Sequence, residues 1–395
     1  MELIMAATTD FCEETIESAQ KTNKTVMSFS LSRDALLKPL QLVAGAVERR
    51  QTMAILSNIF LSVRGNKLSL TATDLELELS SHVELEGASE EGNITVSARK
   101  FLDICRTLPA DAIIKLEMKN DRAILSTQKS KFTLSTLPAE EFPKVEEGKG
   151  QVTFSVSQKT LKNVLASTHF SIAQQDMRYY LNGMLFELRE DELRLIATDG
   201  HRLSLGSIDR LKLKKGNNAQ VIVPRKGVME LMRLLNDSDD MIEFIIGSNH
   251  IYAMTSEFKF ISKLIEGKFP DYTRVIPKKG DKVVEIDREI LKQAFTRVAI
   301  LSNEKYRGIR LFLSENVLRI SANNPEQEEA EEDLLIEYNG GELEIGFNVN
   351  YLIDVCQAIQ SSTIKLVFAD SNSSLLVEED QELGSFTYVV MPMRL

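Results

Sequence analysis

The sequence holds four histidines: His82, His169, His201 and His250. Histidine is the side chain best suited to proton transfer near neutral pH, and His201 lies between Asp199 and Ser204. A hydrolase would need this serine as nucleophile and this histidine as its oriented base. Their positions in one short segment give no reason for the two side chains to face each other. We therefore interpret Asp199-Gly200-His201 as a turn after a strand, with a polar side chain at its rim.

Metal binding and nucleotide hydrolysis have little support in the sequence. The three cysteines, Cys12, Cys105 and Cys356, form no CxxC pair, and no two histidines have the spacing of a zinc site. Such separated cysteines are typical of reduced thiols rather than of a disulfide framework. The acidic run at 328–332 could bind a cation, but we expect a solvated loop there. Neither GxxxxGK[ST] nor GxGxxG occurs, so ATP hydrolysis is not indicated, and we expect no cofactor.

The length and composition are those of a globular protein with two or three domains. The chain has 395 residues, 43% of them hydrophobic and 27% charged, with a formal net charge of −11. No window is apolar over the roughly 18 residues that a membrane span needs, so we expect no membrane partner and a cytoplasmic protein. Residues 1–26 differ from the rest and match neither a secretory signal nor a transit peptide. We expect a disordered or weakly helical extension there, or Met27 as the physiological start.

Internal repetition is the strongest signal in the sequence. Similar strand-like segments begin at Leu68 (LSLTATD), Leu193 (LRLIATD) and Leu318 (LRISANN), 125 residues apart in each case. So regular a spacing indicates three copies of one unit. In the first copy, the alternation of leucine and glutamate from Leu75 to Leu79 predicts that the strand continues as a half-buried antiparallel strand.

Three further segments recur in every copy. Each copy opens with an alternating strand that runs into a helix, with Ser32, Ser157 and Asp287 at the expected N-caps. Pro39 should kink the first of these helices, or that helix begins later. A second strand–helix segment follows in each copy, and a pair of strands joined by turn residues closes it.

The repeats predict an α+β fold of three tandem domains, each with antiparallel sheets outside and two helices inside. We expect the domains at 27–148, 151–277 and 283–395. The short charged segments Glu146–Gly150 and Pro277–Lys282 would link them. The repeat period is longer than that of ordinary solenoids, so each unit can hold a core of its own.

Charge is segregated between the predicted helices and the rest of the chain. The helices expected at 32–47, 98–108, 157–169, 224–236, 287–300 and 349–360 carry 13 basic and 6 acidic residues, although the whole chain is acidic. A solvated helix face could explain such an excess. The three-fold repetition favours one continuous basic surface, which would contact nucleic-acid phosphates without sequence choice.

Helix packing indicates how many copies would surround a duplex. Six helices packed about 10 Å apart on a circle leave a hole of roughly 9 Å, whereas double-stranded DNA is roughly 20 Å across. Twelve helices leave a hole of about 28 Å. A head-to-tail dimer of this chain would supply twelve helices and would also pair the outer sheet edges, forming a ring.

From Met27 to Leu395 the chain closely resembles the bacterial DNA polymerase III beta subunit family, the sliding clamps. The similarity is carried by QQDMRYYLNGMLFE (174–187), ATDGHRL (197–203), VPRKGVMELMR (223–233), KFPDYTRV (268–275), AILSNEKYRG (299–308), NNPEQEEAEE (323–332) and VVMPMRL (389–395). These segments come from all three repeats. The resemblance implies a non-enzymatic processivity factor: a head-to-tail homodimer that encircles double-stranded DNA, is loaded by a separate ATP-driven clamp loader, and tethers DNA polymerase subunits and other proteins through a short clamp-binding peptide.

The resemblance also implies three sets of functional residues. The peptide would bind between the second and third repeats, at Leu181, Thr198, Gly200, His201, Arg202, Leu203, Pro270, Arg274, Val275, Ser374, Val389, Val390, Met391, Pro392, Met393 and Arg394. DNA contacts would include Arg50, Gln175, Tyr179 and Tyr180, although the two tyrosines could equally be core residues. The dimer interface would include Ile300 and Leu301. An apolar, methionine-lined groove suits diverse peptides.

The sequence departs from close relatives at a few positions. Gln51 and Ala54 stand where we expect prolines, and Asn372 is more polar than expected at the rim of the pocket. Two other functions remain as alternatives: a DNA-processing enzyme, and a sheet-based scaffold that binds peptides without DNA.

Overall fold

The structure is a computed structural model that describes residues 27–47, 53–145, 150–209, 211–215, 218–381 and 384–394. The predicted extension at 1–26, Arg50, Gln51 and most of the Glu146–Gly150 segment lie outside the described residues.

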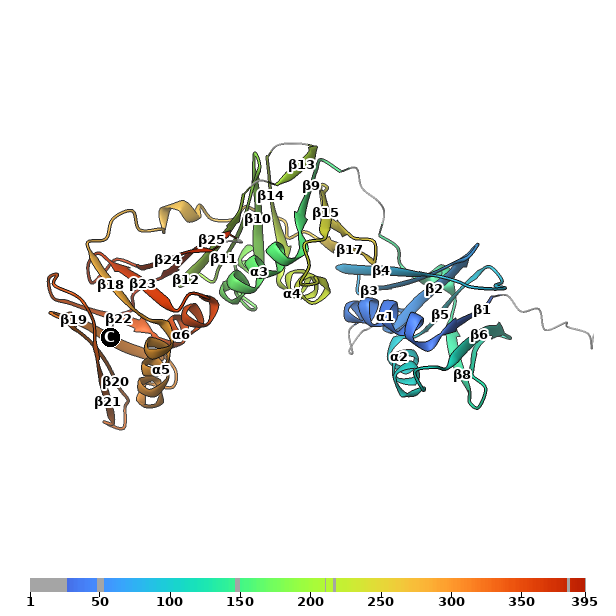
Figure 1. The fold of residues 1–395 in the computed structure, drawn as a ribbon, viewed down its shortest axis with the longest axis horizontal. Helices are drawn as coiled ribbons and strands as arrows, with labels where there is room; N and C mark the ends of the chain where they lie inside the picture. Colours follow the sequence, from blue (N-terminus) through green and yellow to red (C-terminus); the bar gives the residue numbers. More distant parts are fainter. Residues whose placement is uncertain are drawn as a thin grey trace, which may run out of the picture. The chain divides into compact units, whose positions relative to one another are not determined.

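One order of elements occurs three times along the chain: a strand, a helix, four strands, a second helix and three strands (Figure 1). The first repeat consists of β1 (Ser28–Ser32), α1 (Arg33–Val43), β2 (Asn58–Arg64), β3 (Lys67–Thr73), β4 (Leu77–Glu84), β5 (Gly92–Ser97), α2 (Ala98–Thr107), β6 (Ile113–Lys119), β7 (Arg122–Ser126) and β8 (Lys131–Leu137). The second consists of β9 (Val152–Ser157), α3 (Gln158–Thr168), β10 (Gly183–Arg189), β11 (Glu192–Thr198), β12 (Arg202–Ile208), the additional β13 (Lys212–Lys215), β14 (Asn218–Pro224), α4 (Arg225–Leu234), β15 (Met241–Ile246), β16 (His250–Met254) and β17 (Phe258–Lys263). The third consists of β18 (Lys282–Asp287), α5 (Arg288–Val298), β19 (Gly308–Ser314), β20 (Val317–Asn323), β21 (Glu329–Leu335), β22 (Leu343–Asn348), α6 (Val349–Ala358), β23 (Thr363–Phe368), β24 (Leu375–Gln381) and β25 (Gly384–Val390). The predicted α+β fold with three copies of one unit is confirmed.

The first helix of each repeat begins where the sequence predicts. The side chains of Ser32, Ser157 and Asp287 each accept a hydrogen bond from the backbone N–H three residues on. These bonds satisfy one of the amide groups that a helix start leaves unpaired. The first helix includes the buried Pro39 and still starts at Arg33, so a later start is excluded.

The predicted continuation of the strand through Leu75 is wrong. The chain turns between β3 and β4, and the carboxylate of Asp74 accepts hydrogen bonds from the backbone N–H groups of Glu76, at 2.9 Å, and Leu77, at 2.7 Å. Leu75 has a φ of +78°, a conformation that leucine rarely adopts. The aspartate turn therefore overrides the strand propensity of the leucines that follow.

The acidic run at 328–332 is not a loop, as we expected, but largely part of strand β21. Its side chains are paired with cations of the same repeat. Glu332 forms an ion pair with Arg297 of α5, and Asp333 accepts hydrogen bonds from Arg319 of β20 at 2.8 and 2.9 Å. Because cations of the neighbouring strand and of α5 neutralise its carboxylates, so acidic a segment can remain extended.

Backbone contacts group the chain into two compact units. One unit runs to Glu146 and includes Ser256–Phe260, and the other comprises Glu147–Thr255 and Ile261–Leu395. In the first unit the strand orders are β1-β6-β7-β8 and β5-β2-β3-β4, and β8 meets β5 at one end. In the second unit an eight-stranded sheet has the order β14-β10-β11-β12-β25-β24-β23-β18. This sheet is therefore shared by the second and third repeats.

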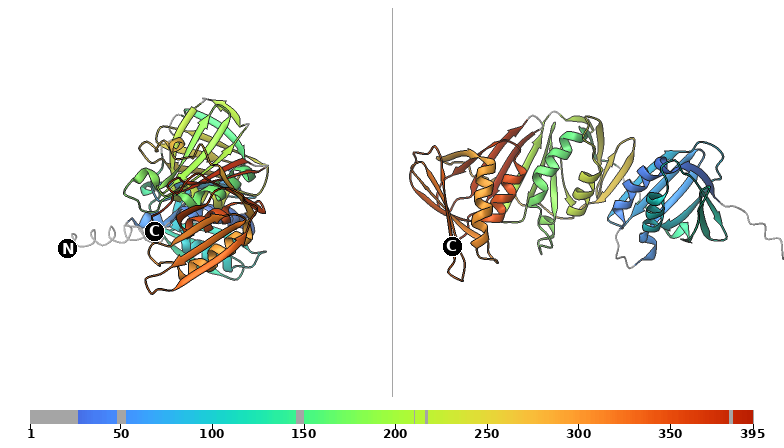
Figure 2. Two further views of the ribbon diagram at one scale, coloured as in Figure 1. Left: turned by 90° about the vertical axis from the view of Figure 1, so that its left-hand side faces the viewer. Right: turned by 60° about the horizontal axis from the view of Figure 1, so that its bottom comes forward.

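The two helices of each repeat contact each other, and the second and third repeats carry their helices on the same side of the strands (Figures 1 and 2). An arginine at the first position of a helix joins the pair in two repeats. The guanidinium of Arg33 donates to the carbonyl of Cys105 at 3.1 Å, and that of Arg288 donates to the carbonyl of Ile359 at 2.6 Å. These two cations satisfy carbonyl groups near the neighbouring helix's C-terminus, so they have a structural role. In the described part of the chain, no helix is both long and apolar enough to span a bilayer.

Candidate functional site at the junction of the second and third repeats

The segment Asp199–His201 forms the predicted turn between β11 and β12. One carboxylate oxygen of Asp199 accepts hydrogen bonds from the backbone N–H groups of His201, at 2.9 Å, and Arg202, at 3.0 Å. The hydroxyl of Thr198 donates to the carbonyl of Arg202 at 2.6 Å. Gly200 has a φ of +89°, and a β-carbon there would lie 2.9 Å from the guanidinium nitrogens of Arg178. The positive φ favours glycine at this position, whereas the exposed end of the Arg178 side chain could move away from a β-carbon.

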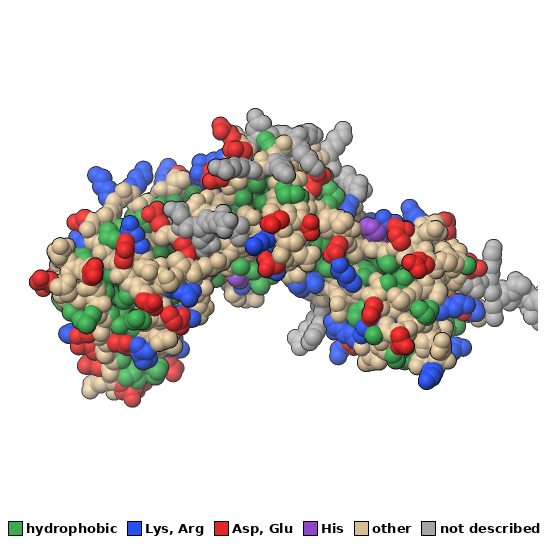
Figure 3. Space-filling view, in the orientation of Figure 1, with side chains coloured by type: hydrophobic (Ala, Val, Ile, Leu, Met, Phe, Trp, Pro, Cys, Tyr) green, Lys and Arg blue, Asp and Glu red, His purple; other side chains and the backbone are tan. Residues whose placement is uncertain are grey.

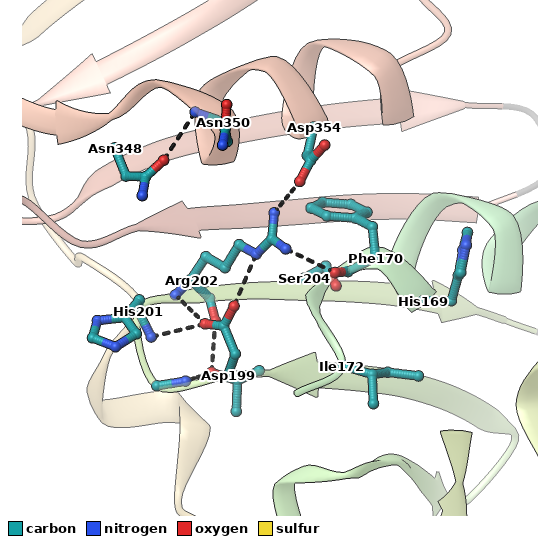
Figure 4. Close-up of polar contacts among 12 residues, drawn as sticks. His169, Phe170, Ile172, Asp199, His201, Arg202, Ser204, Asn348, Asn350 and Asp354 are labelled. Atoms are coloured by element: carbon teal, nitrogen blue, oxygen red, sulfur yellow. Dashed lines mark hydrogen bonds and ion pairs between the residues drawn. The ribbon is translucent and has the colours of Figure 1, made fainter. Parts of the chain in front are cut away.

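Arg202 joins the second repeat to the third (Figure 4). Its guanidinium donates to Asp199 at 3.0 Å, to the carbonyl of Phe170 at 3.0 Å and to Asp354 of α6 at 2.5 Å. It also lies over the ring of Tyr351, 4.6 Å from the centroid. Only 12% of the side chain is exposed. Because the Arg202 side chain is largely buried, pairs with two carboxylates and stacks on an aromatic ring, it is held in one orientation.

The hydrolase interpretation is excluded by the surroundings of Ser204. Its side chain is fully buried, and its hydroxyl donates to the carbonyl of Thr168 at 2.6 Å. His201 is exposed and lies beside Tyr351, with ring centroids 6.3 Å apart. The serine therefore has no basic partner and no access to a substrate. In the described residues, no group of three or more histidine, cysteine or acidic side chains could hold a metal ion.

Strand pairing and a shared apolar core close the junction. Strand β12 pairs with β25 in antiparallel register, with Leu203 opposite Val389 and Ser204 opposite Tyr388. Leu203 and Val389 belong to one buried cluster that also contains Tyr272 of the segment between the repeats, and Val275 packs against it. Burial of this apolar surface ties the second and third repeats together.

The segment that connects the second repeat to the third is anchored by a buried carboxylate. The hydroxyl of Tyr272 donates to Glu187 of β10 at 2.5 Å, and Glu187 is 1% exposed. Arg189 donates to the same carboxylate at 2.9 Å, and Gln220 also donates to it. Burial opposes ionisation of Glu187, but these three donors outweigh it and hold the pKa of Glu187 below its usual value.

The tail, residues 391–394 after β25, extends from the Asp199–His201 turn of the second repeat to β22 of the third repeat. The backbone N–H of Met391 donates to the carbonyl of His201, and that of Met393 donates to the carbonyl of Gly346, both at 2.9 Å. The tail therefore lies across the junction, where its methionine side chains are half-buried.

The sixteen residues implied for peptide binding differ in exposure. Five are buried: Leu181, Thr198, Leu203, Val389 and Val390. Seven are half-buried: Gly200, Arg202, Val275, Ser374, Met391, Pro392 and Met393. Four are exposed: His201, Pro270, Arg274 and Arg394. The buried members can contribute only to the floor of a binding surface, whereas the half-buried and exposed members can contact a ligand.

The loop before β10 carries the described residues implied for DNA contact. Tyr179 is 58% exposed, Tyr180 is half-buried against the apolar cluster, and Gln175 is exposed with a φ of +56°. In the same loop, hydrogen bonds from Arg178 lower the pKa of Asp176 to about 2, so this carboxylate is ionised at neutral pH. Arg50 lies outside the described residues.

The residues implied for the dimer interface follow helix α5. Ile300 is 73% exposed and Leu301 is half-buried, both in the turn Ala299–Leu301. Both side chains are therefore accessible to a partner subunit, as the resemblance implies.

Comparison with known proteins identifies the family. Residues 27–146, 155–271 and 273–394 match, in turn, the N-terminal, central and C-terminal domains of the DNA polymerase III beta subunit. The chain belongs to this family. It is 56% identical over 369 residues to the beta sliding clamp of Pseudomonas aeruginosa and 51% identical to that of Escherichia coli K12, covering 93% of this chain and all of each relative.

Solved structures agree with the sequence comparison. The DnaN sliding clamp of Pseudomonas aeruginosa bound to griselimycin has a TM-score of 0.90 at 56% identity, and the DNA polymerase sliding clamp of Caulobacter crescentus has one of 0.87 at 34% identity. Each match covers 93% of this chain and 100% of the other. The chain is thus a DNA sliding clamp, a processivity factor of DNA replication and not an enzyme.

Sequence reasoning missed two features of this family member's junction. Asp354 was not predicted to contact Arg202, although acidic residues, Asp103 and Glu230, occupy the same position in the second helix of the other repeats. That repetition was the available signal. Glu187 and Tyr272 are far apart in sequence, and Glu187 alternates with apolar residues as a solvent-facing strand residue would. No sequence signal paired them.

Proposed function

We propose that two copies of this chain associate head to tail into a ring that encircles double-stranded DNA, and that the junction described above binds a short peptide of DNA polymerase subunits and other partners. A separate clamp loader would open and close the ring. The domain boundaries at 27–148, 151–277 and 283–395 are part of this proposal, as is a cytoplasmic location, which suits the buried free thiols of Cys105 and Cys356.

The main support for the ring is the strand pairing between the second repeat and the third. Strand β12 of the second repeat pairs with β25, the last strand of the third. The strand that matches β12 in the third repeat is β21, which lies at the edge of its four-stranded sheet among the described residues. The strand that matches β25 in the first repeat is β8. A second copy would therefore supply β8 to β21 in the geometry that the chain already uses once.

The internal repeat also predicts the register of this contact. Ser204 and Ala330 occupy matching positions, because they pair with the matching residues Ala197 and Ala322. Tyr388 and Phe132 also occupy matching positions, because they pair with the matching residues Val377 of β24 and Leu125 of β7. Since Ser204 faces Tyr388, Ala330 would face Phe132 of the partner subunit.

Charges are complementary in that register. One step along, Glu331 would face Lys131 of the partner subunit, and Asp333 would face Lys129 of the partner subunit. Both lysines are exposed, and acidic side chains lie over the β20–β21 end of the third repeat (Figure 3). Opposite charges directly across an antiparallel pair are stabilising. Leu335, at the end of β21, is 87% exposed and would be partly covered by the partner subunit.

The helices support sequence-independent contact with DNA phosphates. In the second and third repeats, which form one compact unit, α3 lies beside α6, where Gln360 donates to Asn163. Lys159 on α3, Arg233 on α4 and Arg297 on α5 are exposed, and the two arginines also form ion pairs with Glu230 and Glu332. A basic surface of this kind binds any duplex through its phosphates.

The junction supports peptide docking. It combines an apolar cluster, half-buried methionines and the positioned Arg202 in one place, which is the chemistry that short motifs with apolar anchors recognise. Deleting residues 391–395 should abolish stimulation of the polymerase and leave the dimer intact. Loss of the dimer as well would contradict the assignment of the tail to the peptide site.

Retention on DNA of different topology tests the ring. The protein is loaded, with a clamp loader, onto a nicked circular plasmid and onto the same plasmid linearised. A ring remains on the circle and slides off the linear molecule. Equal retention on both would refute encirclement and would favour a protein that simply binds DNA. No binding to either, with peptide binding intact, would favour a peptide-binding scaffold.

Charge reversal tests the interface. We expect Lys129→Glu with Lys131→Glu to be monomeric, and likewise Glu331→Lys with Asp333→Lys, because like charges would then face each other in both contacts of the dimer. Mixing the two variants should restore a dimer, since each contact again joins opposite charges. Two variants that both remain dimeric in sedimentation analysis would exclude this register.

A further inference from the structure

The third repeat contains a cavity of about 460 Å³ that shares only Met393 and Arg394 with the proposed peptide site. It lies at the start of β19 and the end of β20, and the tail of the chain forms one side of it. Asn303, Tyr306 and Asn323 contribute to its wall, together with Met393 and Arg394 of the tail.

This cavity is the third repeat's counterpart of the peptide site. Strands β10 and β11 match β19 and β20 with the 125-residue spacing of the repeat. Transferred by that spacing, Leu181 corresponds to Tyr306, Thr198 to Asn323 and Gly200 to Pro325. All three of these third-repeat residues line the cavity. Strands β10 and β11, which contribute to the peptide site, therefore recur in the third repeat as β19 and β20 with different side chains.

The tail connects the two surfaces. Met393 and Arg394 line the cavity and also belong to the residues implied for peptide binding. The backbone bonds of Met391 to His201 and of Met393 to Gly346 hold the tail between the two sites. A chain bound at the junction can thus continue along the tail into the cavity without leaving the protein surface.

The chemistry of the cavity differs from that of the junction. Arg310 and Arg394 are among the residues that line it, and no acidic residue occurs among the described residues that form it. Arg310 bonds Glu344 at 3.0 Å, but both side chains are about half exposed, so this ion pair exchanges easily. Asparagine side chains and the 56% exposed Tyr306 add hydrogen-bonding groups and a ring face. The cavity therefore favours an anionic, extended segment over an apolar one.

We propose that this cavity is a second docking site, and that it takes acidic residues that flank the clamp-binding motif of a partner protein. The proposal rests on the peptide site of the proposed function. The junction holds the apolar anchors of the motif, and Arg310 pairs with a carboxylate of the flanking segment. Partner proteins that share one motif would then differ in affinity according to the charge of the residues that flank the motif.

Fluorescence anisotropy on the full-length protein tests this assignment. Three sets of labelled peptides share one clamp-binding motif: the motif alone, the motif with four acidic residues added on either side, and the motif with four lysines added on either side. We expect an acidic extension on one side to tighten binding by about threefold at low salt, as for a partly exposed ion pair. The gain should shrink as salt rises.

Variants of Arg310 separate the cavity from the junction. Arg310→Gln should leave affinity for the motif alone unchanged and remove the gain from the acidic extension. Arg310→Glu combined with Glu344→Arg keeps the surface ion pair and reverses the charge in the cavity, so the lysine extension should become the tighter peptide. Lys365→Glu, an exposed change on β23 away from the cavity, serves as the control and should preserve the acidic gain.

The outcomes are distinguishable. The second docking site is refuted if the acidic extension still increases affinity in both Arg310 variants. It is also refuted if the extension gives no increase in the original protein while the motif alone still binds. Failure of the motif alone to bind overturns the peptide site itself. Displacement of the acidic peptide by a short single-stranded oligonucleotide, lost in Arg310→Gln, would overturn the peptide assignment and identify the cavity as a phosphate site.

Discussion

Replacing Tyr272 with phenylalanine tests whether the buried carboxylate beneath the connecting segment stabilises the junction. The change removes one hydroxyl and keeps the ring, which is 5% exposed and packs in the shared apolar cluster. The carboxylate of Glu187 loses the 2.5 Å bond and keeps those from Arg189 and Gln220. The substitution therefore isolates a single hydrogen bond to a buried charge.

The expected cost follows from the type of bond. A hydrogen bond to a charged group contributes about 1.5–3 kcal/mol, and the loss leaves an acceptor partly unsatisfied in a site without water access. Tyr338→Phe is a matched control: Tyr338 is 6% exposed, and its hydroxyl donates at 2.6 Å to a neutral acceptor, the carbonyl of Gly341. Loss of a bond to a neutral group costs about 0.5–1.5 kcal/mol.

Amide hydrogen exchange measures the effect where it should occur. We expect exchange in 264–281 to accelerate in Tyr272→Phe by about tenfold or more, since 1.4 kcal/mol corresponds to a factor of 10. The same segment should be unaffected in Tyr338→Phe. Unchanged exchange in 264–281, with a fully folded protein, would refute the claim that Glu187 anchors the segment.

Acid should weaken the same contact. The pKa of Glu187 lies below its usual value in the folded protein, because the hydrogen bonds from Tyr272, Arg189 and Gln220 outweigh the opposing effect of burial. Its stabilisation is therefore present above the unfolded pKa of about 4.3 and is lost as pH falls through the lower folded value. We expect the urea midpoint to fall less steeply with acid in Glu187→Gln. Parallel pH profiles would contradict this linkage.

Three further changes probe other parts of the chain. Gly200→Ala should strain the turn by roughly 1–3 kcal/mol, because φ is +89°, and the displaced turn should weaken motif-peptide binding; unaltered anisotropy titrations would argue against it. Ile300→Ala with Leu301→Ala should shift the dimer to monomer, and an unchanged gel-filtration volume would remove these residues from the interface. Burial raises the pKa of Cys356 to about 12, so this thiol should resist alkylation at pH 8 until the protein is denatured; rapid labelling of native protein would show that it is accessible.

The repeated elements were predictable because each depends on neighbouring residues. The N-caps at Ser32, Ser157 and Asp287 need only the amide groups of the following turn. Five of the six helices begin and end within two residues of the expected positions, and α1 ends four residues before its expected end. The 125-residue spacing is visible without any structure. Local signals that recur three times reinforce one another, so both the α+β fold and the repeat could be inferred with the sequence alone.

The errors arose where a non-local or unusual contact decides the structure. Leu75 looks like a strand residue, but the side chain of Asp74 forms a turn that places it at positive φ. The acidic run is extended because Arg319 and Arg297 neutralise it across the sheet. The side-chain partners of Arg202 come from segments far apart in the chain, so the resemblance could name the residue but not its bond to Asp354.

The shared eight-stranded sheet has a consequence for how the protein is made. Strand β12 emerges from the ribosome long before its partner β25, so until then the edge of β12 and the apolar side chains behind it have no covering strand from the third repeat. Pairing across so long a stretch of sequence is slow, and unpaired edges favour aggregation. The junction can thus mature only after translation of the third repeat. A chain truncated within that repeat would lack strand β25 at the junction, and the exposed edge would mark the chain for chaperones or proteolysis.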